Sequence, residues 1–261
     1  MSVIQSEMID EGVTLITLNN LPLNLVTVEL TKVLSDKLDE LASDHSVRVL
    51  IVTGKGERAF CAGSDIGEFA GFVGPDGQVL QRKLIAENTV YSKVDKFPKP
   101  TIAALNGQAL GGGLELAVCC DLLVAAENIQ LSLPEVNLGV FPGSGGTVRV
   151  TRRIGEGRAK EMMLLGEPID AHVALGWGLV NRVVPAVQAL EKSRELAARL
   201  AGLPSRALQL CKQAIDLSFD TDETDAVRQT LALSDEVFQT KDVAEGIRAF
   251  FAKEKPRFQH L

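Results

Sequence analysis

The sequence lacks the features that mark several common classes of protein. Its formal net charge is −7 and it has no basic stripe with interleaved aromatic residues, so nucleic acid is not an expected partner. No apolar run approaches the roughly 18 residues of a membrane span, so no membrane association is expected either. The first residues carry neither the apolar core of a signal peptide nor an arginine-rich transit sequence. These absences predict a soluble, cytoplasmic protein.

Cysteine and histidine are scarce and dispersed. The four cysteines show no Cys-x-x-Cys spacing, and Cys119 and Cys120 are adjacent within an apolar run. We interpret the cysteines as small buried side chains in a reducing compartment. The three histidines, His45, His172 and His260, are too scattered to suggest a metal cluster. We therefore expect no metal site.

Glycine is frequent, but the glycine loops do not match the common nucleotide-binding or hydrolase motifs. The loop at Gly143 does not fit Gly-x-Gly-x-x-Gly, because its third glycine comes too early, and no P-loop lysine follows. Ser144 is preceded two positions earlier by Pro142, where a nucleophile elbow requires glycine. The glycine loops are therefore not generic nucleotide cradles.

Hydrophobic periodicity predicts an α/β core followed by an all-helical region. The chain has 261 residues, 46% of them hydrophobic, enough for one large domain or one and a half. Strands and helices alternate as far as Pro185, and helices alone follow. Strands are expected over 13–18, 47–53, 101–105, 122–126, 129–131 and 180–184. Helices are expected over 27–41, 78–96, 147–154, 186–201, 205–219, 223–238 and 243–251.

The stretch 107–121 combines three consecutive glycines with an apolar run that has the character of a helix. If the helix begins near Gly112, its first N–H groups lack intrahelical partners and lie at the positive end of the helix dipole, where an oxyanion can bind. Glu115 lies three residues later, on about the same face. Its neighbours Leu114 and Leu116 predict burial, which raises the pKa of a carboxyl group. Alternatively, the glycines only allow close packing and Glu115 is a solvated glutamate.

A second carboxylate occurs in a similar setting. Glu135 follows Pro134 in an otherwise apolar stretch that leads into a glycine-rich bend over 143–146. Taken alone, it would be interpreted as an exposed loop glutamate. Paired with Glu115, it suggests the addition of water to a polarised double bond, in which one carboxylate activates water and the other delivers a proton.

Three blocks of the sequence, 59–66, 106–115 and 134–146, resemble the signature blocks of the enoyl-CoA hydratase/isomerase (crotonase) superfamily. The likeness extends from Val13 to Lys253. It implies an α/β fold, a crotonase-type spiral of ββα turns, followed by helices that pack trimers, often as a dimer of trimers. It also implies a division into residues 1–200, the spiral core with the active site, and residues 201–261, a helical region for oligomerisation and active-site cover.

The resemblance implies an activity as well, the reversible syn addition of water across the 2,3 double bond of a 2-enoyl-CoA thioester. The product is a 3-hydroxyacyl-CoA, in fatty-acid or related catabolism. The backbone N–H groups of Ser64 and Gly112 match the positions that bind the thioester oxygen and stabilise an enolate. Glu115 matches the residue that positions and deprotonates water for attack at C3, and Glu135 the residue that protonates C2. Gly143 matches a loop position whose backbone helps to hold the water.

Coenzyme A is implied as part of the substrate and not as a permanently bound cofactor. The family positions that lie along it correspond to Leu23, Leu25, Ala62, Asp65 and Ile66. Phe250 and Lys253 match positions that reach coenzyme A from a neighbouring subunit. Alternatively, these two are a core aromatic residue and a solvated lysine.

Other members of the superfamily keep two alternative functions open. One is a dehydratase or isomerase acting on another acyl-CoA, for example a carnitinyl thioester. The other is a crotonase-fold binding protein without catalytic activity. The acidic balance and the presence of both Glu115 and Glu135 favour an enzyme over that binding protein, and the two glutamates argue against a simple isomerase.

Overall fold

The computed structural model describes residues 2–74 and 77–260. At its centre is a six-stranded sheet in the order β1-β2-β3-β5-β7-β10. Every neighbouring pair is parallel except β1 and β2, which are antiparallel. Strands β3 and β5 are buried along their whole length, as expected of apolar strands in a parallel sheet that is covered on both faces. The strands are β1 (Ile4–Asp10), β2 (Val13–Leu18), β3 (Val49–Gly54), β5 (Thr101–Leu105), β7 (Leu122–Ala126) and β10 (Arg182–Val184).

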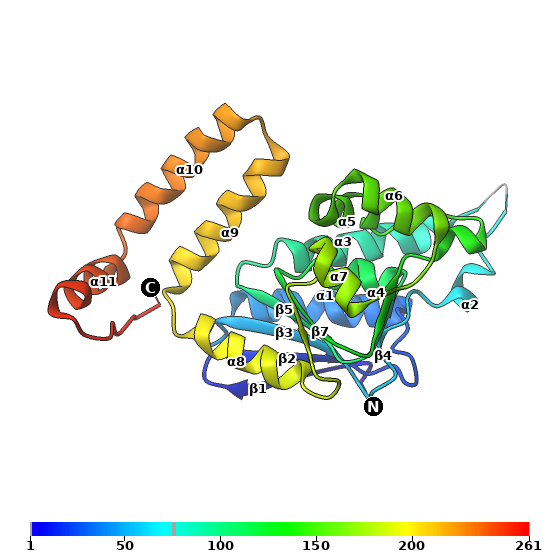
Figure 1. Cartoon of the computed structure of the whole chain (residues 1–261), viewed down its shortest axis with the longest axis horizontal. Coiled ribbons are helices and arrows are strands. Elements are labelled where there is room, and N and C mark those ends of the chain that lie inside the picture. The colour runs from blue at the N-terminus through cyan, green and yellow to red at the C-terminus, as the bar shows by residue number, and fades with distance from the viewer. Residues whose placement is uncertain (1, 75–76, 261) are drawn as a thin grey trace.

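A smaller, four-stranded sheet has the order β4-β6-β8-β9. Strands β4, β6 and β8 each come directly after a strand of the larger sheet, and β6 pairs in parallel with both β4 and β8. Each turn of the chain therefore gives one strand to each sheet before it enters a helical segment, and the chain advances as a spiral of ββα turns (Figure 1). The strands are β4 (Ala59–Cys61), β6 (Gln108–Leu110), β8 (Gln130–Ser132) and β9 (Ile169–Asp170).

Helices cover both faces of the larger sheet. On one face, α1 packs Leu30, Leu34 and Leu38 into the main core beside α3. The start of α1 is capped by Thr27, whose Oγ1 accepts a hydrogen bond from the N–H of Leu30 at 3.1 Å. On the other face, α8 packs Leu196 and its neighbours against β2, β3 and β5. The helical segments are α1 (Val28–Ser43), α2 (Ile66–Phe69), the π-helical turn η1 (Leu80–Leu84), α3 (Ile85–Asp95), α4 (Gly112–Ala117), the 3₁₀ turn η2 (Glu135–Leu138), α5 (Gly146–Ile154), α6 (Glu156–Leu165), α7 (Ala171–Trp177), α8 (Ala189–Ala201), α9 (Ser205–Asp220), α10 (Glu223–Phe238) and α11 (Lys241–Ala252).

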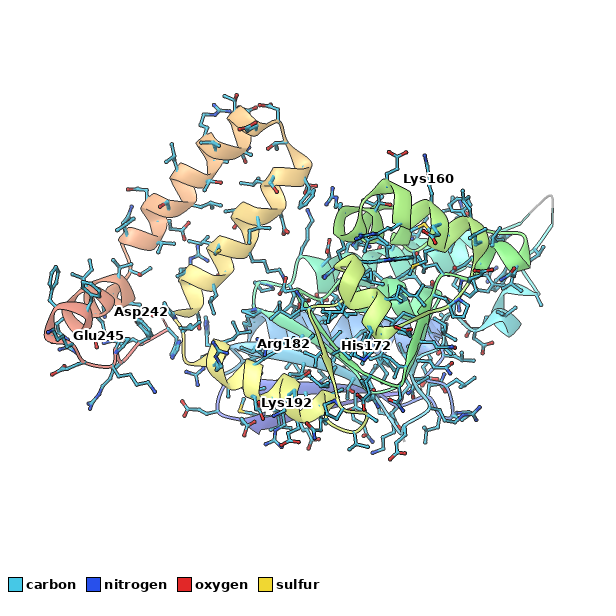
Figure 2. The ribbon with its side chains drawn as sticks, in the orientation of Figure 1. Lys160, His172, Arg182, Lys192, Asp242 and Glu245 are labelled. Atoms are coloured by element: carbon cyan, nitrogen blue, oxygen red, sulfur yellow. The ribbon has the colours of Figure 1, made fainter. Side chains whose placement is uncertain are left out.

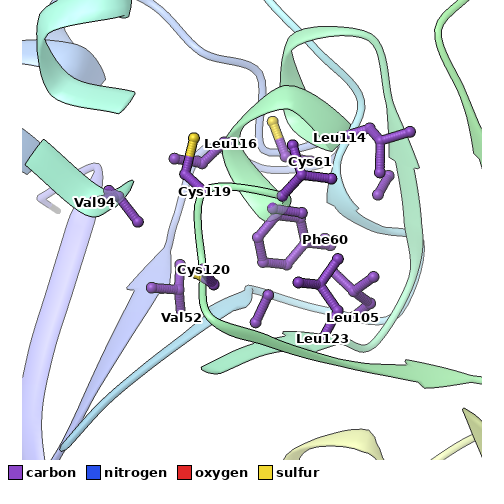
Figure 3. Close-up of a cluster of buried hydrophobic side chains, with 14 of the residues drawn as sticks. Val52, Phe60, Cys61, Val94, Leu105, Leu114, Leu116, Cys119, Cys120 and Leu123 are labelled. Carbon is purple, nitrogen blue, oxygen red and sulfur yellow. The ribbon is translucent and has the colours of Figure 1, made fainter. Parts of the chain in front are cut away.

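The main core continues beneath α4, where side chains from strands and helices meet around Phe60 (Figure 3). Three cysteines, Cys61, Cys119 and Cys120, are buried in this cluster with free thiols, as the sequence predicts. The same prediction is wrong for Cys211, which is exposed on α9. The reason is that Cys211 lies on a face of α9 that the described residues leave uncovered, whereas its neighbour Leu210 faces inward and is buried.

The last three helices extend from the core. Helices α9 and α10 pack against each other, and α11 lies beyond them at one end of the molecule (Figure 1). On α9, Lys212 forms an ion pair of 2.9 Å with Asp121 of the core. On α11, Asp242 and Glu245 accept hydrogen bonds from backbone N–H groups of the segment 257–260 (Figure 2). These contacts tie the end of the chain back onto its last helix.

Helices α9 to α11 carry large apolar side chains that are exposed in the single chain. They are Ile215, Phe219, Val227, Leu231, Phe238, Ile247, Phe250 and Phe251. The predicted division at residue 200 falls at the end of α8, the last helix that packs on the sheet, and it stays a prediction. No helix within 2–74 and 77–260 is both long enough and apolar enough to pass through a bilayer.

Candidate active site

The start of α4 meets the segment that follows β4, and two backbone N–H groups come close together there. Helix α4 begins at Gly112, as the sequence predicts. A Cβ at Gly112 would lie 2.9 Å from Ser64 Oγ and 3.3 Å from Ser64 N, so any side chain at this position would crowd Ser64. Within the described residues, neither the N–H of Ser64 nor that of Gly112 donates a hydrogen bond. Both are therefore available to a ligand oxygen.

Glu115 is buried one turn into α4, with 3% of its surface exposed. Its Oε1 accepts hydrogen bonds from the N–H groups of Ser144 at 2.8 Å and Gly146 at 2.7 Å. Burial raises the pKa of Glu115 to about 7, although these two hydrogen bonds act in the opposite direction. The burial and the raised pKa that the sequence predicts are both present, so the alternative of a solvated glutamate is wrong.

Glu135 opens the 3₁₀ turn η2 and lies against the start of α4. A Cβ at Gly111 would lie 2.8 Å from its Oε1, and Gly111 itself has a φ of +51°, which favours glycine. The Oε2 atom of Glu135 is buried and has no hydrogen-bond partner among residues 2–74 and 77–260. Burial raises the pKa of this carboxyl group too. The two glutamates that the sequence singles out thus both lie at the start of α4.

The loop 142–146 lies over Glu115. A Cβ at Gly146 would be 2.9 Å from Cγ of Glu115, so glycine is required for the backbone to reach the carboxylate. Gly143 belongs to the same loop, and its carbonyl accepts a hydrogen bond from Asn88 Nδ2 at 2.8 Å. Gly143 also borders an open cavity of about 600 Å³, whose other walls come from η1 and α3.

The residues expected along coenzyme A fall into two groups. The segment 23–26 lies beside 62–65, because the N–H of Ala62 donates to the carbonyl of Leu23 at 3.0 Å and the N–H of Asp65 donates to that of Val26 at 2.9 Å. Leu23, Leu25, Ala62 and Asp65 are half-buried there, and Ile66 is exposed.

Phe250 and Lys253 lie elsewhere, at the end of α11 and far from α4 in the same chain (Figure 1). Phe250 is 78% exposed, so it is not a core aromatic residue of this chain.

Sequence reasoning missed a set of polar residues behind this site. Lys83, Glu87 and Tyr91 are buried on one face of η1 and α3, and Ser144 is buried in the loop 142–146. The spacing of four between Lys83, Glu87 and Tyr91 within an expected helix is the signal that could have identified them, because residues i and i+4 share a face. Ser144 carries no such signal in the sequence.

Known proteins resemble this chain over nearly its whole length. The model of the enoyl-CoA hydratase/isomerase family matches residues 8–260. The chain is 38% identical to the YngF protein of Bacillus subtilis, with 97% of this chain and 96% of YngF covered. It is 35% identical to the short-chain-enoyl-CoA hydratase of Clostridium acetobutylicum, with 94% of each chain covered. The crystal structure of an enoyl-CoA hydratase from Bacillus anthracis matches with a TM-score of 0.94 at 37% identity, covering 99% of this chain and 100% of that chain. The fold expected from the three sequence blocks is thereby confirmed.

Proposed function

Since this chain belongs to the enoyl-CoA hydratase/isomerase family, we propose that Glu115 and Glu135 together add water across the 2,3 double bond of a 2-enoyl-CoA thioester. The general activity of the chain is that of an enoyl-CoA hydratase, an enzyme of the hydro-lyase type. Glu115 acts as the base that activates water for addition at C3, and Glu135 is the acid that protonates C2. The product is a 3-hydroxyacyl-CoA.

The observation that carries this proposal is the unequal hydrogen bonding of the two carboxylates. Two backbone N–H groups donate to Oε1 of Glu115, which favours the ionised form. Oε2 of Glu115 accepts no hydrogen bond from the described residues, so it can accept one from water. Glu135 Oε2 is buried without a donor in the same part of the chain, so it can carry the proton that C2 receives. Burial raises the pKa of both carboxyl groups, that of Glu115 to about 7, so the difference in hydrogen bonding, and not a difference in pKa, assigns the roles of base and acid.

The steps balance as the addition of one water molecule. The N–H groups of Ser64 and Gly112 donate to the thioester oxygen and draw electrons from the double bond, which makes C3 electrophilic. Glu115 takes a proton from water as the water oxygen bonds to C3, with the backbone of Gly143 helping to hold that water, and the negative charge moves onto the thioester oxygen as an enolate. Glu135 then gives its proton to C2, and proton exchange with solvent restores both carboxyl groups.

The coenzyme A part of the substrate binds along the two adjacent segments described above and leaves with the product. The residues that we propose for this contact are Leu23, Leu25, Ala62, Asp65 and Ile66. Phe250 and Lys253 would reach coenzyme A only from a neighbouring subunit, because α11 lies far from α4 in its own chain. The exposed apolar side chains of α9 to α11 support such an assembly, a trimer or a dimer of trimers. The cytoplasmic location stays a prediction.

The experiment that tests this function follows the loss of enone-thioester absorbance when the purified protein is mixed with crotonyl-CoA. Rapid loss is expected, with 3-hydroxybutyryl-CoA confirmed as the product. If a coenzyme A thioester binds and no absorbance is lost, the proposed substrate changes to an acyl-CoA bulkier or more polar than crotonyl-CoA, such as the carnitinyl thioester of the dehydratase alternative. Failure to bind any coenzyme A thioester would contradict the enzyme assignment and leave a binding protein.

A further inference from the structure

Helix α3 carries a third buried carboxylate, Glu87, directly behind the proposed oxyanion donors. Its side chain is 1% exposed. Ser64 Oγ donates to both of its oxygens at 3.0 Å, and Ser144 Oγ donates to Oε2 at 2.8 Å. Hydration by Glu115 and Glu135 requires no third carboxylate, so the presence of Glu87 needs another explanation.

The buried ammonium group of Lys83 balances the negative charge of Glu87. Lys83, one turn earlier and also 1% exposed, has its Nζ 3.5 Å from Glu87 Oε1. The same Nζ donates to Glu68 Oε2 at 2.5 Å and to the carbonyl of Val26 at 3.0 Å. Burial raises the pKa of Glu87, while Lys83 and the serine hydroxyls lower it. A buried polar network whose members are all bonded in this way is rigid.

Each serine that Glu87 holds also presents a backbone N–H group to the site. The N–H of Ser64 is one half of the proposed oxyanion hole, and the N–H of Ser144 donates to Glu115 Oε1 at 2.8 Å. We propose that Glu87 is a positioning residue whose carboxylate clamps these two serines and so fixes the oxyanion donor relative to the catalytic base. This inference rests on the hydratase function proposed above.

Other contacts of α3 agree with this role. Tyr91, one turn after Glu87, donates its hydroxyl to the carbonyl of Gly112 at 2.8 Å. Asn88 donates to the carbonyl of Gly143 at 2.8 Å. One helix therefore holds both the start of α4 and the loop that lies over the base. A carboxylate suits the central position because its two oxygens accept from two hydroxyl groups at once.

The test compares Glu87→Met with Glu87→Gln in the crotonyl-CoA assay. Methionine has nearly the same length and bonds to neither serine. The kcat of the Glu87→Met variant is expected to fall about 10- to 100-fold, the loss that a misplaced catalytic group causes. Its KM is expected to change by less than about 3-fold. Glutamine spans the same distance, accepting from one serine and donating to the other, so its kcat is expected to stay within about 5-fold of the wild type. Lys83 keeps its bond to Glu68 in both variants.

A second set of variants tests whether Glu87 acts through the serines. The double variant Ser64→Ala/Ser144→Ala is expected to lose as much kcat as Glu87→Met. Adding Glu87→Met to it is expected to cause little further loss, because the three substitutions remove the same contacts. The matched controls are Glu161→Met and Glu161→Gln on the exposed side of α6, and both are expected to keep the wild-type kcat.

Three results would overturn the inference while leaving the proposed function intact: an undiminished kcat in Glu87→Met, an equal loss in Glu87→Gln, or additive losses in the triple variant. An equal loss in Glu87→Gln would mean that the charge matters and not the clamp. If Glu87→Met does not fold, the serine double variant decides, and a wild-type kcat there counts against the clamp. A wild-type protein that hydrates no enoyl-CoA overturns the proposed function and the inference together.

Discussion

The substitution Glu115→Gln is expected to slow hydration strongly and at the same time to stabilise the protein at neutral and alkaline pH. Burial raises the pKa of Glu115 from 4.5 to about 7, so the folded protein keeps this proton over a pH range in which the unfolded chain releases it. The free energy of unfolding therefore falls as the pH rises through that range. Glutamine has the same shape without the charge, and the N–H groups of Ser144 and Gly146 can still donate to its Oε1.

The magnitude follows from the size of the shift. A difference of about 2.5 pH units, at about 1.4 kcal/mol per unit, means that ionised Glu115 lowers the free energy of unfolding by about 3 kcal/mol at pH 8. At pH 5 the group is protonated in the folded protein and partly protonated in the unfolded chain, so the effect is below about 1 kcal/mol. The gain of about 3 kcal/mol corresponds to roughly 6–12 °C in the midpoint of thermal unfolding.

Urea unfolding of the wild type and of Glu115→Gln, at one protein concentration and at pH 5 and pH 8, measures this difference. The matched control is Glu161→Gln, an exposed carboxylate on α6, which is expected to change the free energy of unfolding by less than about 0.5 kcal/mol at either pH. The crotonyl-CoA assay on the same samples is expected to show a loss of about 10²- to 10⁴-fold in kcat for Glu115→Gln alone.

Two outcomes would refute the reasoning. If Glu115→Gln is no more stable than the wild type at pH 8, the ionised carboxylate is buried at no cost and its pKa is ordinary. If the variant gains the same stability at pH 5 and at pH 8, the gain comes from packing and not from the loss of an ionisable group.

Three further predictions concern the activity. Glu135→Gln is expected to lower kcat by about 10²- to 10⁴-fold and to leave the dissociation constant for butyryl-CoA, measured by calorimetry, unchanged; hydration at the parent rate would show that Glu135 is not the proton donor. The kcat/KM of the wild type for crotonyl-CoA is expected to rise with pH through about 7 as Glu115 ionises, and a pH–rate profile without that limb would exclude Glu115 as the base. Gly112→Ala is expected to lose about 100-fold in kcat, because the new Cβ would lie 2.9 Å from Ser64 Oγ and displace an oxyanion donor. Gly157→Ala, whose Cβ would have no described atom within 4 Å, is its control, and equal activity of the two variants would contradict the close-approach argument.

The long periodic segments of this fold could be predicted because one face of each is buried. The predicted helices 205–219 and 223–238 correspond to α9 and α10 within one residue at each end. Strands β4, β6 and β9 were not predicted, since two or three residues are too few to show alternation and their pairing depends on the neighbouring turns of the spiral. Strand β1 was missed because its central residues are exposed at the edge of the sheet.

In the candidate site too, some residues could be predicted from the sequence and others could not. Glu115 and Glu135 could be identified as carboxylates within apolar sequence, and Gly112 as the start of a helix after a strand. Glu87 could not be connected to the site, because its serine partners are 23 and 57 positions away in the sequence. The unequal hydrogen bonding of Glu115 and Glu135 could not be predicted from the sequence either, because it depends on how the loop 142–146 folds back over α4.

The ββα spiral has a consequence for how such a chain can diverge. Ser64, Gly112 and Glu135 come shortly after β4, β6 and β8, so three successive coils each supply one group at the same edge of the smaller sheet. Losing one residue within β6 would slip its pairing and displace Gly112 relative to the other two. Insertions or deletions in the exposed connections between coils leave the strand pairing, and therefore the spacing of the three groups, unchanged. Substrate range can thus evolve through changes in loop length while the reaction itself is preserved.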